Sequence, residues 1–265
     1  MSRHTDLSFI EKGEGFPVLL GHSYLFDNTM WEYQTDILAQ HYRVIVPDLW
    51  GHGRSPSLPD TIQSLTDVAR EHLYLMDRLD IQEFAIIGLS VGGMWGAELA
   101  VMAPVRVRAL IMLDSFVGSE SREQQQKYEQ MLNTVDTMGA ITSPLLEYIV
   151  SQFYSEYASE DDVNNLSRNL SSLSTDSIRN SIIPLGRLIF GRPDRMTLLD
   201  QIACPAHIAH GDSDLPRPPV EGLMMAERLG CGFSVIPRAG HISNRENPKF
   251  VNALITTFLE KHLPK

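Results

Sequence analysis

Short apolar runs alternate with amphipathic stretches along the first half of the chain, and this alternation constrains the fold more than any other feature. The runs are residues 17–20, 42–46, 84–87 and 109–113. They are continuously apolar, as expected for strands of a parallel sheet that is covered on both faces. Helical patterns at 31–41, 65–79 and 93–103 separate them. This repetition predicts an α/β fold with a mostly parallel central sheet flanked by helices.

The alternation stops after residue 114. From about 116 to 196 the chain shows helical patterns at 120–138 and 144–157. A Ser/Asn-rich stretch, 164–181, and then residues 182–190 follow, and they fit a loop or a weakly polar helix. Strand patterns return at 206–209 and 232–236, and helical patterns at 222–229 and 248–261. Roughly eighty residues are too many for a simple connection. We therefore expect a core of residues 1–115 and 197–265, with residues 116–196 inserted as a helical cap.

Composition narrows the classes of function. The 265 residues carry a formal net charge of -11, which disfavours binding to nucleic acid or to an anionic membrane surface. Residues 1–6 lack the apolar core of a signal peptide and no apolar run could span a bilayer, so we expect a cytoplasmic protein. Cys204 and Cys231 lack the spacing of metal ligands, which is typical of two reduced thiols.

Residues 88–92 read Gly-Leu-Ser-Val-Gly and match the G-x-S-x-G nucleophile motif. The motif lies between a predicted strand and a predicted helix, which is the context that it requires. Small residues on both sides allow a sharp turn that projects the hydroxyl of Ser90 over the sheet edge. The helix that follows directs its N-terminus toward developing negative charge. Ser90 is therefore our candidate nucleophile.

A serine hydroxyl needs a base, and histidine has the appropriate pKa, about 6.5. His241 follows the last predicted strand, so it lies at the sheet edge where ligands of open α/β sheets gather. His52 lies in a turn. His207 and His210 flank a strand, and no carboxylate ligand set accompanies them, so we expect structural roles rather than a metal site.

An acid is needed to orient the base. Asp212 and Asp214 follow the strand at 206–209, and the chain order serine, acid, histidine fits either of them. Asp114, at the end of an earlier strand, is a third candidate.

Several motifs in this order resemble the α/β-hydrolase superfamily over essentially the whole chain. Residues 47–55 resemble the PDxxGHGxS turn, in which His52 is a structural residue. Residues 211–214 resemble the G-x-x-D segment, which implies Asp214 as the acid. Residues 240–248 resemble the GHxxxxExP segment around the histidine, here His241.

The resemblance also implies an oxyanion hole. One donor is the backbone N–H of Val91, which follows the nucleophile. The family commonly has His-Gly-x after the first core strand, and this chain has His22-Ser23-Tyr24. The backbone N–H of Tyr24 is then the second donor. Ser23 departs from the family pattern, because glycine there permits special backbone angles.

We expect a serine hydrolase that cleaves small-molecule carboxylic esters through an acyl-enzyme intermediate, without metal or organic cofactor. Related chemistries of the same fold stay open: thioesterase, lactonase, carbon–carbon bond hydrolase, cofactor-free haloperoxidase, or carrier-protein methyl esterase. A ligand receptor that retains the triad is the alternative from another class. The carrier alternative rests on a basic stretch that could dock an acidic carrier protein, made up of Arg168, Arg179, Arg187, Arg192 and Arg195.

Overall fold

The computed structural model describes residues 7–264, so the expectation about the first six residues lies outside the described part of the chain. One sheet runs through it in the order β1-β3-β2-β4-β5-β6-β7. Only β1 is antiparallel to its neighbour; the other adjacent pairs are parallel. The strands are β1 (Phe9–Lys12), β2 (Phe16–Gly21), β3 (Tyr42–Pro47), β4 (Phe84–Leu89), β5 (Val107–Leu113), β6 (Ala206–Gly211) and β7 (Gly232–Ile236).

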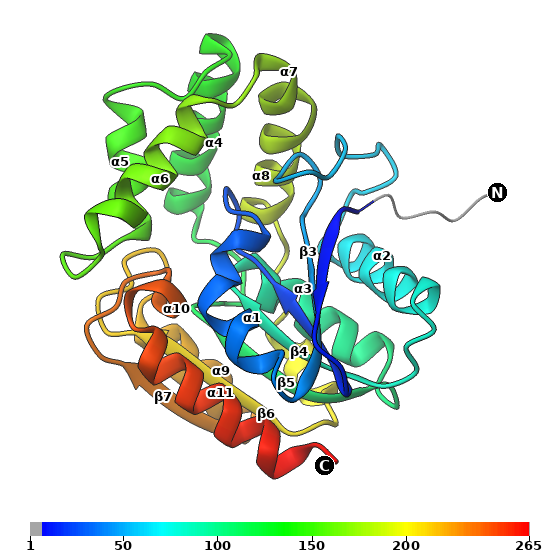
Figure 1. The fold of residues 1–265 in the computed structure, drawn as a ribbon. Helices are drawn as coiled ribbons and strands as arrows, with labels where there is room; N and C mark the ends of the chain where they lie inside the picture. Colours follow the sequence, from blue (N-terminus) through cyan, green and yellow to red (C-terminus); the bar gives the residue numbers. More distant parts are fainter. Residues whose placement is uncertain (1–6, 265) are drawn as a thin grey trace.

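Helices cover both faces of this sheet, which confirms the predicted fold class (Figure 1). On one face α1 (Glu32–Leu38) packs against α11 (Pro248–His262). On the other face lie α2 (Leu65–Arg78), α3 (Val91–Met102) and α9 (Pro219–Leu229). Because neighbouring side chains of a strand point to opposite faces, each of the strands β2 to β6 contributes to two separate cores. This is why the strands read as continuously apolar runs.

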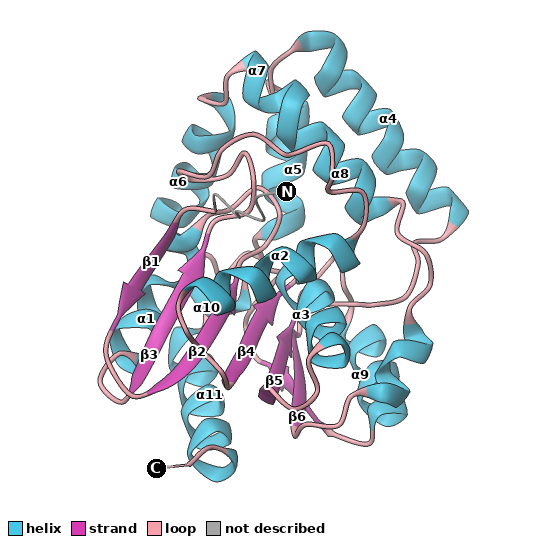
Figure 2. Cartoon of the chain, turned by 90° about the vertical axis from the view of Figure 1, so that its right-hand side faces the viewer, coloured by secondary structure: helices cyan, strands magenta, loops and turns pink. Residues whose placement is uncertain are grey.

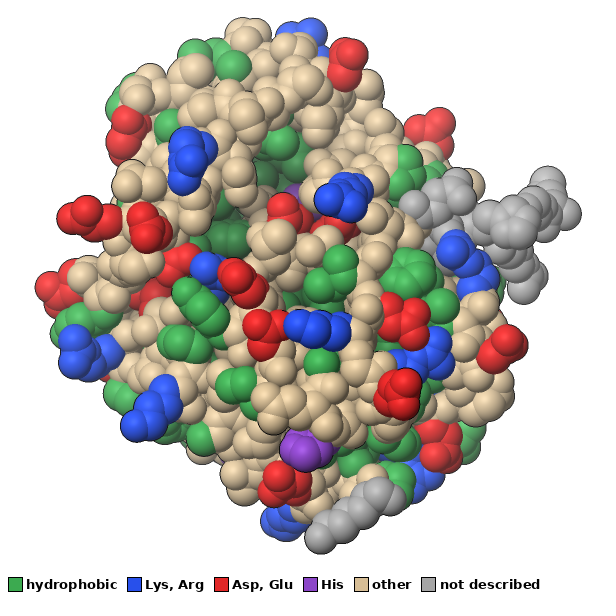
Figure 3. All heavy atoms as spheres, viewed as in Figure 1, with side chains coloured by type: hydrophobic (Ala, Val, Ile, Leu, Met, Phe, Trp, Pro, Cys, Tyr) green, Lys and Arg blue, Asp and Glu red, His purple; other side chains and the backbone are tan. Residues whose placement is uncertain are grey.

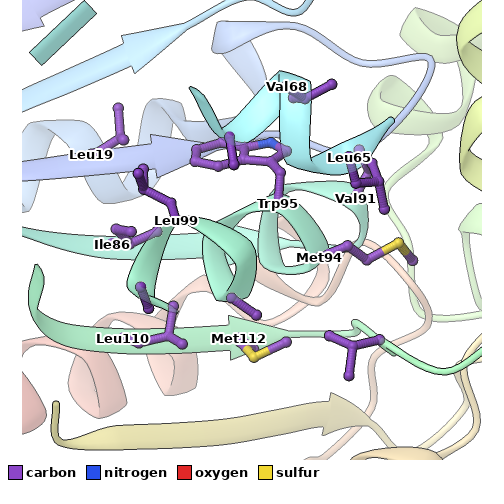
Figure 4. Close-up of a cluster of buried hydrophobic side chains, with 14 of the residues drawn as sticks. Leu19, Leu65, Val68, Ile86, Val91, Met94, Trp95, Leu99, Leu110 and Met112 are labelled. Carbon is purple, nitrogen blue, oxygen red and sulfur yellow. The ribbon is translucent and has the colours of Figure 1, made fainter. Parts of the chain in front are cut away.

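Helix α3 is the buried helix that connects β4 to β5. Figure 4 shows Trp95 on α3 beneath Val68 of α2 and close to Leu19 of β2. Nearly every residue of α3 is buried, so it has no polar face. The helix begins at Val91, two residues earlier than its sequence pattern predicts, so Ser90 directly precedes its first residue.

The inserted segment folds into helices that lie over the carboxyl ends of the parallel strands (Figure 2). The structure resolves the ambiguous Ser/Asn-rich stretch as helix. Ser159 caps α6 through Asp162 N–H, and Ser174 caps the next short helix through Ser177 N–H. The elements are α4 (Arg122–Met138), α5 (Leu145–Phe153), α6 (Glu160–Ser171), α7 (Thr175–Ser177), the π-helical turn η2 (Ile178–Ile182) and α8 (Ile183–Phe190).

Four short elements had no counterpart in the sequence analysis. They are β1, the 3₁₀ helices η1 (Asn28–Trp31) and η3 (Met196–Gln201), and α10 (Ser243–Glu246). β1 is a four-residue edge strand whose last three residues are exposed, so it has no apolar run to reveal it. Among the described residues, no helix combines the length and the apolar character needed to cross a bilayer.

Candidate active site

Ser90 lies in a sharp turn between β4 and α3. Its φ of 56° and ψ of -120° are angles that a residue with a side chain rarely adopts. The two flanking glycines make the turn feasible. A Cβ atom on Gly88 would lie 2.2 Å from the carbonyl of Gly92, and one on Gly92 would lie 2.1 Å from the carbonyl oxygen of Gly21. The glycines of the motif are thus required by backbone contacts on both sides.

Backbone and side-chain hydrogen bonds hold Ser90 in this conformation. Its N–H donates to the carbonyl of Leu113 at 2.9 Å, and its own carbonyl accepts from the Ser115 hydroxyl at 2.7 Å. Val91 is the first residue of α3, so its N–H has no partner within the helix and remains available as a donor. The positive end of the helix dipole therefore lies directly behind the serine.

The structure brings Ser90, His241 and Asp214 together, although they lie far apart in the sequence. Nε2 of His241 is 2.9 Å from Oγ of Ser90, and Nδ1 is 3.0 Å from each carboxyl oxygen of Asp214. Asp214 also accepts the N–H of Arg217 at 2.9 Å. The other acid of that turn, Asp212, points away and accepts the backbone N–H groups of Arg238 and Ala239. Its contacts are those of a turn-stabilising residue.

Burial dominates the electrostatics of the two titratable groups, His241 and Asp214. It lowers the pKa of His241 to about 4. Burial also raises the pKa of Asp214, while the hydrogen bond from the N–H of Arg217 opposes this shift. A neutral imidazole is the form that can accept a proton from a serine hydroxyl. The site therefore holds His241 ready as a base over most of the pH range.

The loop that carries His241 is fastened to the inserted helices. The carbonyl of Phe153, at the end of α5, accepts the N–H groups of His241 at 3.1 Å and Ile242 at 3.3 Å. Glu246 accepts the N–H of Gly240 at 2.9 Å and also binds the hydroxyl of Ser155. The position of the histidine thus depends on contacts with the segment after α5.

Two histidines shape the loop that contains Tyr24. Nε2 of His22 accepts the N–H of Leu49 at 2.8 Å, and Nε2 of His52 accepts the N–H of Leu25 at 3.1 Å. The residue with positive φ in this loop is Leu25, at 70°, and not Ser23. Ser23 therefore fits without the special angles that glycine would supply. The Tyr24 hydroxyl donates to the carbonyl of Ile182 at 2.7 Å, and so ties this loop to η2.

A cavity opens above Ser90 and His241, with about 910 Å³ of empty space including its mouth. Figure 3 shows the molecular surface hollowed between the upper helices and the core, with hydrophobic side chains inside. Most of the wall comes from α4, α5, η2 and α8. The lining residues from these four elements are Tyr128, Met131, Leu132, Val135, Tyr148, Ile149, Gln152, Phe153, Ile182, Ile183, Ile189 and Phe190.

Sequence analysis missed one charged residue in this wall. Arg217 lines the cavity, and its buried guanidinium pairs with Glu120 and with Glu221 at 3.2 Å. Arg192 joins the same cluster through Glu120 at 2.8 Å. Two cations thus face two carboxylates, so the cluster carries no net charge. Its members come from separate parts of the chain, and no local pattern indicates them.

The predicted basic patch needs correction. Arg192 is 3% exposed and forms part of that internal cluster, so it contributes nothing to a surface. Arg179, Arg187 and Arg195 each lie against a carboxylate, of Asp136, Glu129 and Glu98 respectively. Arg168 bonds the side chain of Asn165. The arginines are close in sequence, but burial and pairing with carboxylates from distant parts of the chain prevent them from forming one free basic surface.

The expectation that no carboxylates accompany His210 was wrong: among the described residues, Asp114, His210 and Asp214 have the composition of a metal site, with potential ligand atoms within 4.8 Å of one another. Both ring nitrogens of His210 are already engaged, Nδ1 with the carbonyl of Arg217 at 2.8 Å and Nε2 with that of Ser115 at 3.1 Å. Asp214 is engaged with His241. His207, the other histidine of that strand, instead bonds Ser234 at 2.9 Å. These donors suit an internal hydrogen-bond network better than a metal ion.

Comparison with known proteins gives a consistent result. A family model described as alpha/beta hydrolase fold matches residues 17–248. A pimeloyl-[acyl-carrier protein] methyl ester esterase of Legionella pneumophila is 26% identical over 91% of this chain and 92% of that protein. The 3-oxoadipate enol-lactonase 1 of Acinetobacter baylyi is 22% identical over 88% and 85%. The structure of a thermophilic esterase from Thermogutta terrifontis superposes with a TM-score of 0.86 at 28% identity, covering 97% of this chain and 94% of that one.

Proposed function

The chain belongs to the α/β-hydrolase family, and from that premise we propose that it hydrolyses neutral carboxylic esters through an acyl intermediate on Ser90. One observation carries the proposal: the hydrogen-bonded series from Ser90 through His241 to Asp214, with both contacts of the imidazole at 2.9–3.0 Å. This is the arrangement in which a base can activate a hydroxyl while an acid fixes its tautomer.

The proposed reaction begins when Oγ of Ser90 attacks the ester carbonyl and gives its proton to Nε2 of His241. The carbonyl oxygen becomes an oxyanion, which accepts hydrogen bonds from the N–H groups of Val91 and Tyr24. The intermediate collapses as the carbon–oxygen bond to the alcohol breaks, and the alcohol takes the proton from His241. Water then repeats the sequence on the acyl group: His241 removes a proton from water, and the acid leaves as Ser90 regains its proton.

The cavity supports neutral, apolar substrates. Its wall consists largely of aliphatic and aromatic side chains, and its one buried cation, Arg217, is neutralised by Glu120 and Glu221. An apolar acyl chain gains free energy by leaving water for such a wall, whereas a carboxylate would be desolvated with no free cation to pair with. We propose that residues 116–196 act as a cap whose inner surface selects the substrate.

Carrier-linked esters form a second candidate, favoured by the full-length likeness to a pimeloyl-[acyl-carrier protein] methyl ester esterase. Among the arginines of the corrected patch, only the exposed ones could contact a carrier. Reversing the charge of Arg168 and Arg179 should then reduce turnover of a carrier-linked ester and leave turnover of a small ester unchanged. If the charge reversals changed the turnover of neither substrate, only the small-molecule role would stand.

Substitution of the nucleophile tests the primary proposal. Ser90→Ala should lower kcat for p-nitrophenyl esters by at least about 10⁴-fold and abolish labelling by a fluorophosphonate. Ser213→Ala is the matched control, because this serine is exposed in the turn next to Asp214 and its hydroxyl, which donates to Asp212 at 2.9 Å, does not contact the proposed triad. Turnover that survives Ser90→Ala would contradict the proposal. Labelling of the wild type without turnover of any ester would instead favour a ligand receptor.

A further inference from the structure

A second buried carboxyl group, that of Asp114, lies directly behind the proposed triad. Asp114 follows the last residue of β5 and is fully buried. Its φ of 48° lies in the left-handed region, which aspartate and asparagine tolerate better than most residues. The mechanism proposed above assigns this residue no task.

Asp114 is held in place from two further elements. One carboxyl oxygen accepts the N–H of Gly211, at the end of β6, at 2.7 Å, and the other binds the hydroxyl of Ser243 on α10. A carboxyl oxygen of Asp114 lies within 4.8 Å of one of Asp214, and a hydrogen bond from Asp114 lowers the pKa of Asp214. Two carboxyl groups therefore meet in a site that water does not reach.

Two buried carboxylates this close repel each other strongly, and one of them retains its proton, as in other carboxylate pairs. A nearby imidazolium could relieve the repulsion, and His210 is the nearest histidine apart from His241. Its two nitrogens face the carbonyls of Arg217 and Ser115, and burial lowers its pKa to about 4. His210 is thus neutral at pH 7 and does not compensate a second negative charge.

The surroundings distinguish the two carboxyl groups. Burial raises the pKa of both carboxyl groups, but at Asp214 the N–H and the guanidinium charge of Arg217 oppose the shift. Among the described residues, Asp114 has no such cation against its carboxyl group: its hydrogen-bond partners are the neutral Gly211 and Ser243, and the charge of Asp214 adds to burial in raising its pKa. His241 is the remaining titratable group that acts on Asp114, and its own pKa is low. The negative charge therefore belongs on Asp214.

We propose that Asp114 and Asp214 share one proton, that Asp114 holds it, and that Asp114 thereby positions Asp214 beneath His241. The inference rests on the proposed function, since it assigns Asp114 to the support of that triad. As a neutral acid, Asp114 donates to the Asp214 carboxylate and fixes the orientation of its oxygens. It also leaves only one negative charge beneath the imidazole, so His241 remains a base at moderately acid pH.

Infrared difference spectroscopy tests the protonation state without depending on catalysis. The wild type at pH 7 should show the carbonyl stretch of a protonated carboxylic acid, with a shift in D₂O, and Asp114→Asn should lack this band. Ser243→Ala removes a hydrogen bond to Asp114, so it should move the same band and not remove it. This second variant keeps the test valid if Asp114→Asn fails to fold. A wild-type spectrum that has no band sensitive to these two variants would overturn the proposal.

The pH dependence of kcat/KM tests the functional consequence. Asp114→Asn preserves a neutral donor and suits a positive φ, so its kcat/KM should stay within about threefold of wild type and its acid limb should not move. Asp114→Leu leaves the N–H of Gly211 and the hydroxyl of Ser243 without a partner, and it should lower kcat more than about tenfold with little change in KM. An acid limb that falls by about one pH unit in Asp114→Asn would show that Asp114 is ionised in the wild type, which contradicts the proposal.

The two proposals fail in different ways. If Ser90→Ala retained full ester turnover, the acyl mechanism would be wrong whatever the infrared spectrum shows. If Ser90→Ala were inactive but the Asp114 band were absent, the acyl mechanism would stand and only the shared proton would be excluded.

Discussion

The backbone conformation of Ser90 sets it apart from the other serines between residues 7 and 264. Angles of this kind cost on the order of 1–3 kcal/mol and persist only where the surroundings enforce them. Here the enforcing contacts are the carbonyl of Leu113, the hydroxyl of Ser115 and the close packing of Gly88 against Gly92. The strain holds Oγ within 2.9 Å of His241 before any substrate arrives. Part of the folding free energy is thereby used to preorganise the nucleophile.

The burial of His241 predicts an unusual pH profile. Its pKa is lowered to about 4, and the neutral imidazole is the active base, so kcat/KM should fall only as the pH drops through that value. We expect most of the plateau activity to remain at about pH 5, where an unburied histidine with a pKa near 6.5 would be almost fully protonated. Ester hydrolysis measured from acid to neutral pH checks this. Asp36→Asn, which removes only an exposed pair with Lys12, serves as a control that should leave the profile unchanged, and a midpoint near 6.5 would contradict the expectation.

Two of the three proposed triad residues could be predicted from the sequence alone. Ser90 and His241 each follow a predicted strand, and parallel strands end at one edge of the sheet, where reactive groups gather. The same rule does not identify the triad acid, because Asp212, Asp214 and Asp114 all follow strands that end at this edge of the sheet. Choosing among them without a family resemblance requires the course of the turn after β6, which directs Asp214 toward His241 and Asp212 toward the N–H groups of Arg238 and Ala239.

At the level of elements, the contact between the end of β2 and the start of α3 predicts a sharp difference between two glycines of one helix. A Cβ on Gly92 would lie 2.1 Å from the carbonyl oxygen of Gly21, so Gly92→Ala should displace the turn, destabilise the fold by about 2 kcal/mol or more, and lower activity. The Cβ of Gly96→Ala would meet Ile86 at 3.1 Å, a tight contact that alanine's higher helix propensity offsets, so its stability should change by less than about 1 kcal/mol. Urea denaturation of both variants measures the change in the free energy of unfolding. Equal changes in the two variants would show that the contact between Gly92 and Gly21 is not limiting.

The elements that sequence analysis predicted have strong local signals, and those it missed do not. The strands β2 to β6 are buried on both faces, which forces continuous apolar runs. β1 gains its order from pairing with β3, so its own residues carry little information. Helices α6 and α7 are polar outside and begin at serine caps, and a Ser/Asn-rich composition by itself fits a loop equally well.

For the molecule as a whole, the buried charge cluster joins the inserted segment to the core. Glu120 precedes α4, Arg192 follows α8, and Arg217 follows β6, so the cluster closes both connections of the insertion. Glu120→Gln would leave two buried guanidiniums against a single carboxylate, and we expect a loss of about 3 kcal/mol in the free energy of unfolding. Glu129→Gln breaks only the exposed pair with Arg187 and should cost less than about 1 kcal/mol. If chemical denaturation gave the same loss of unfolding free energy for both variants, the stabilising role assigned to the Glu120 cluster would be wrong.

The same cluster explains why charge patterning along the chain predicts a basic surface that the folded protein does not form. Five arginines within thirty residues suggest a basic surface when the chain is read as a line. Folding places Arg192 inside the molecule and sets Arg195 against Glu98, nearly a hundred positions away in sequence. Pairing between distant residues determines whether a local excess of charge reaches the surface.

Most of the cavity wall is supplied by the inserted helices, whereas the residues that we assign to bond cleavage lie at the edge of the sheet. Substitutions on the inner sides of α4 and α8 can therefore alter which substrate fits without moving the groups that react, whereas α5 ends at the Phe153 carbonyl that holds the His241 loop. During evolution, single substitutions in these helices can therefore change the substrate range while each variant remains an active enzyme. For engineering, it means that a library limited to these helices should yield altered specificities at a higher rate than one spread over the chain.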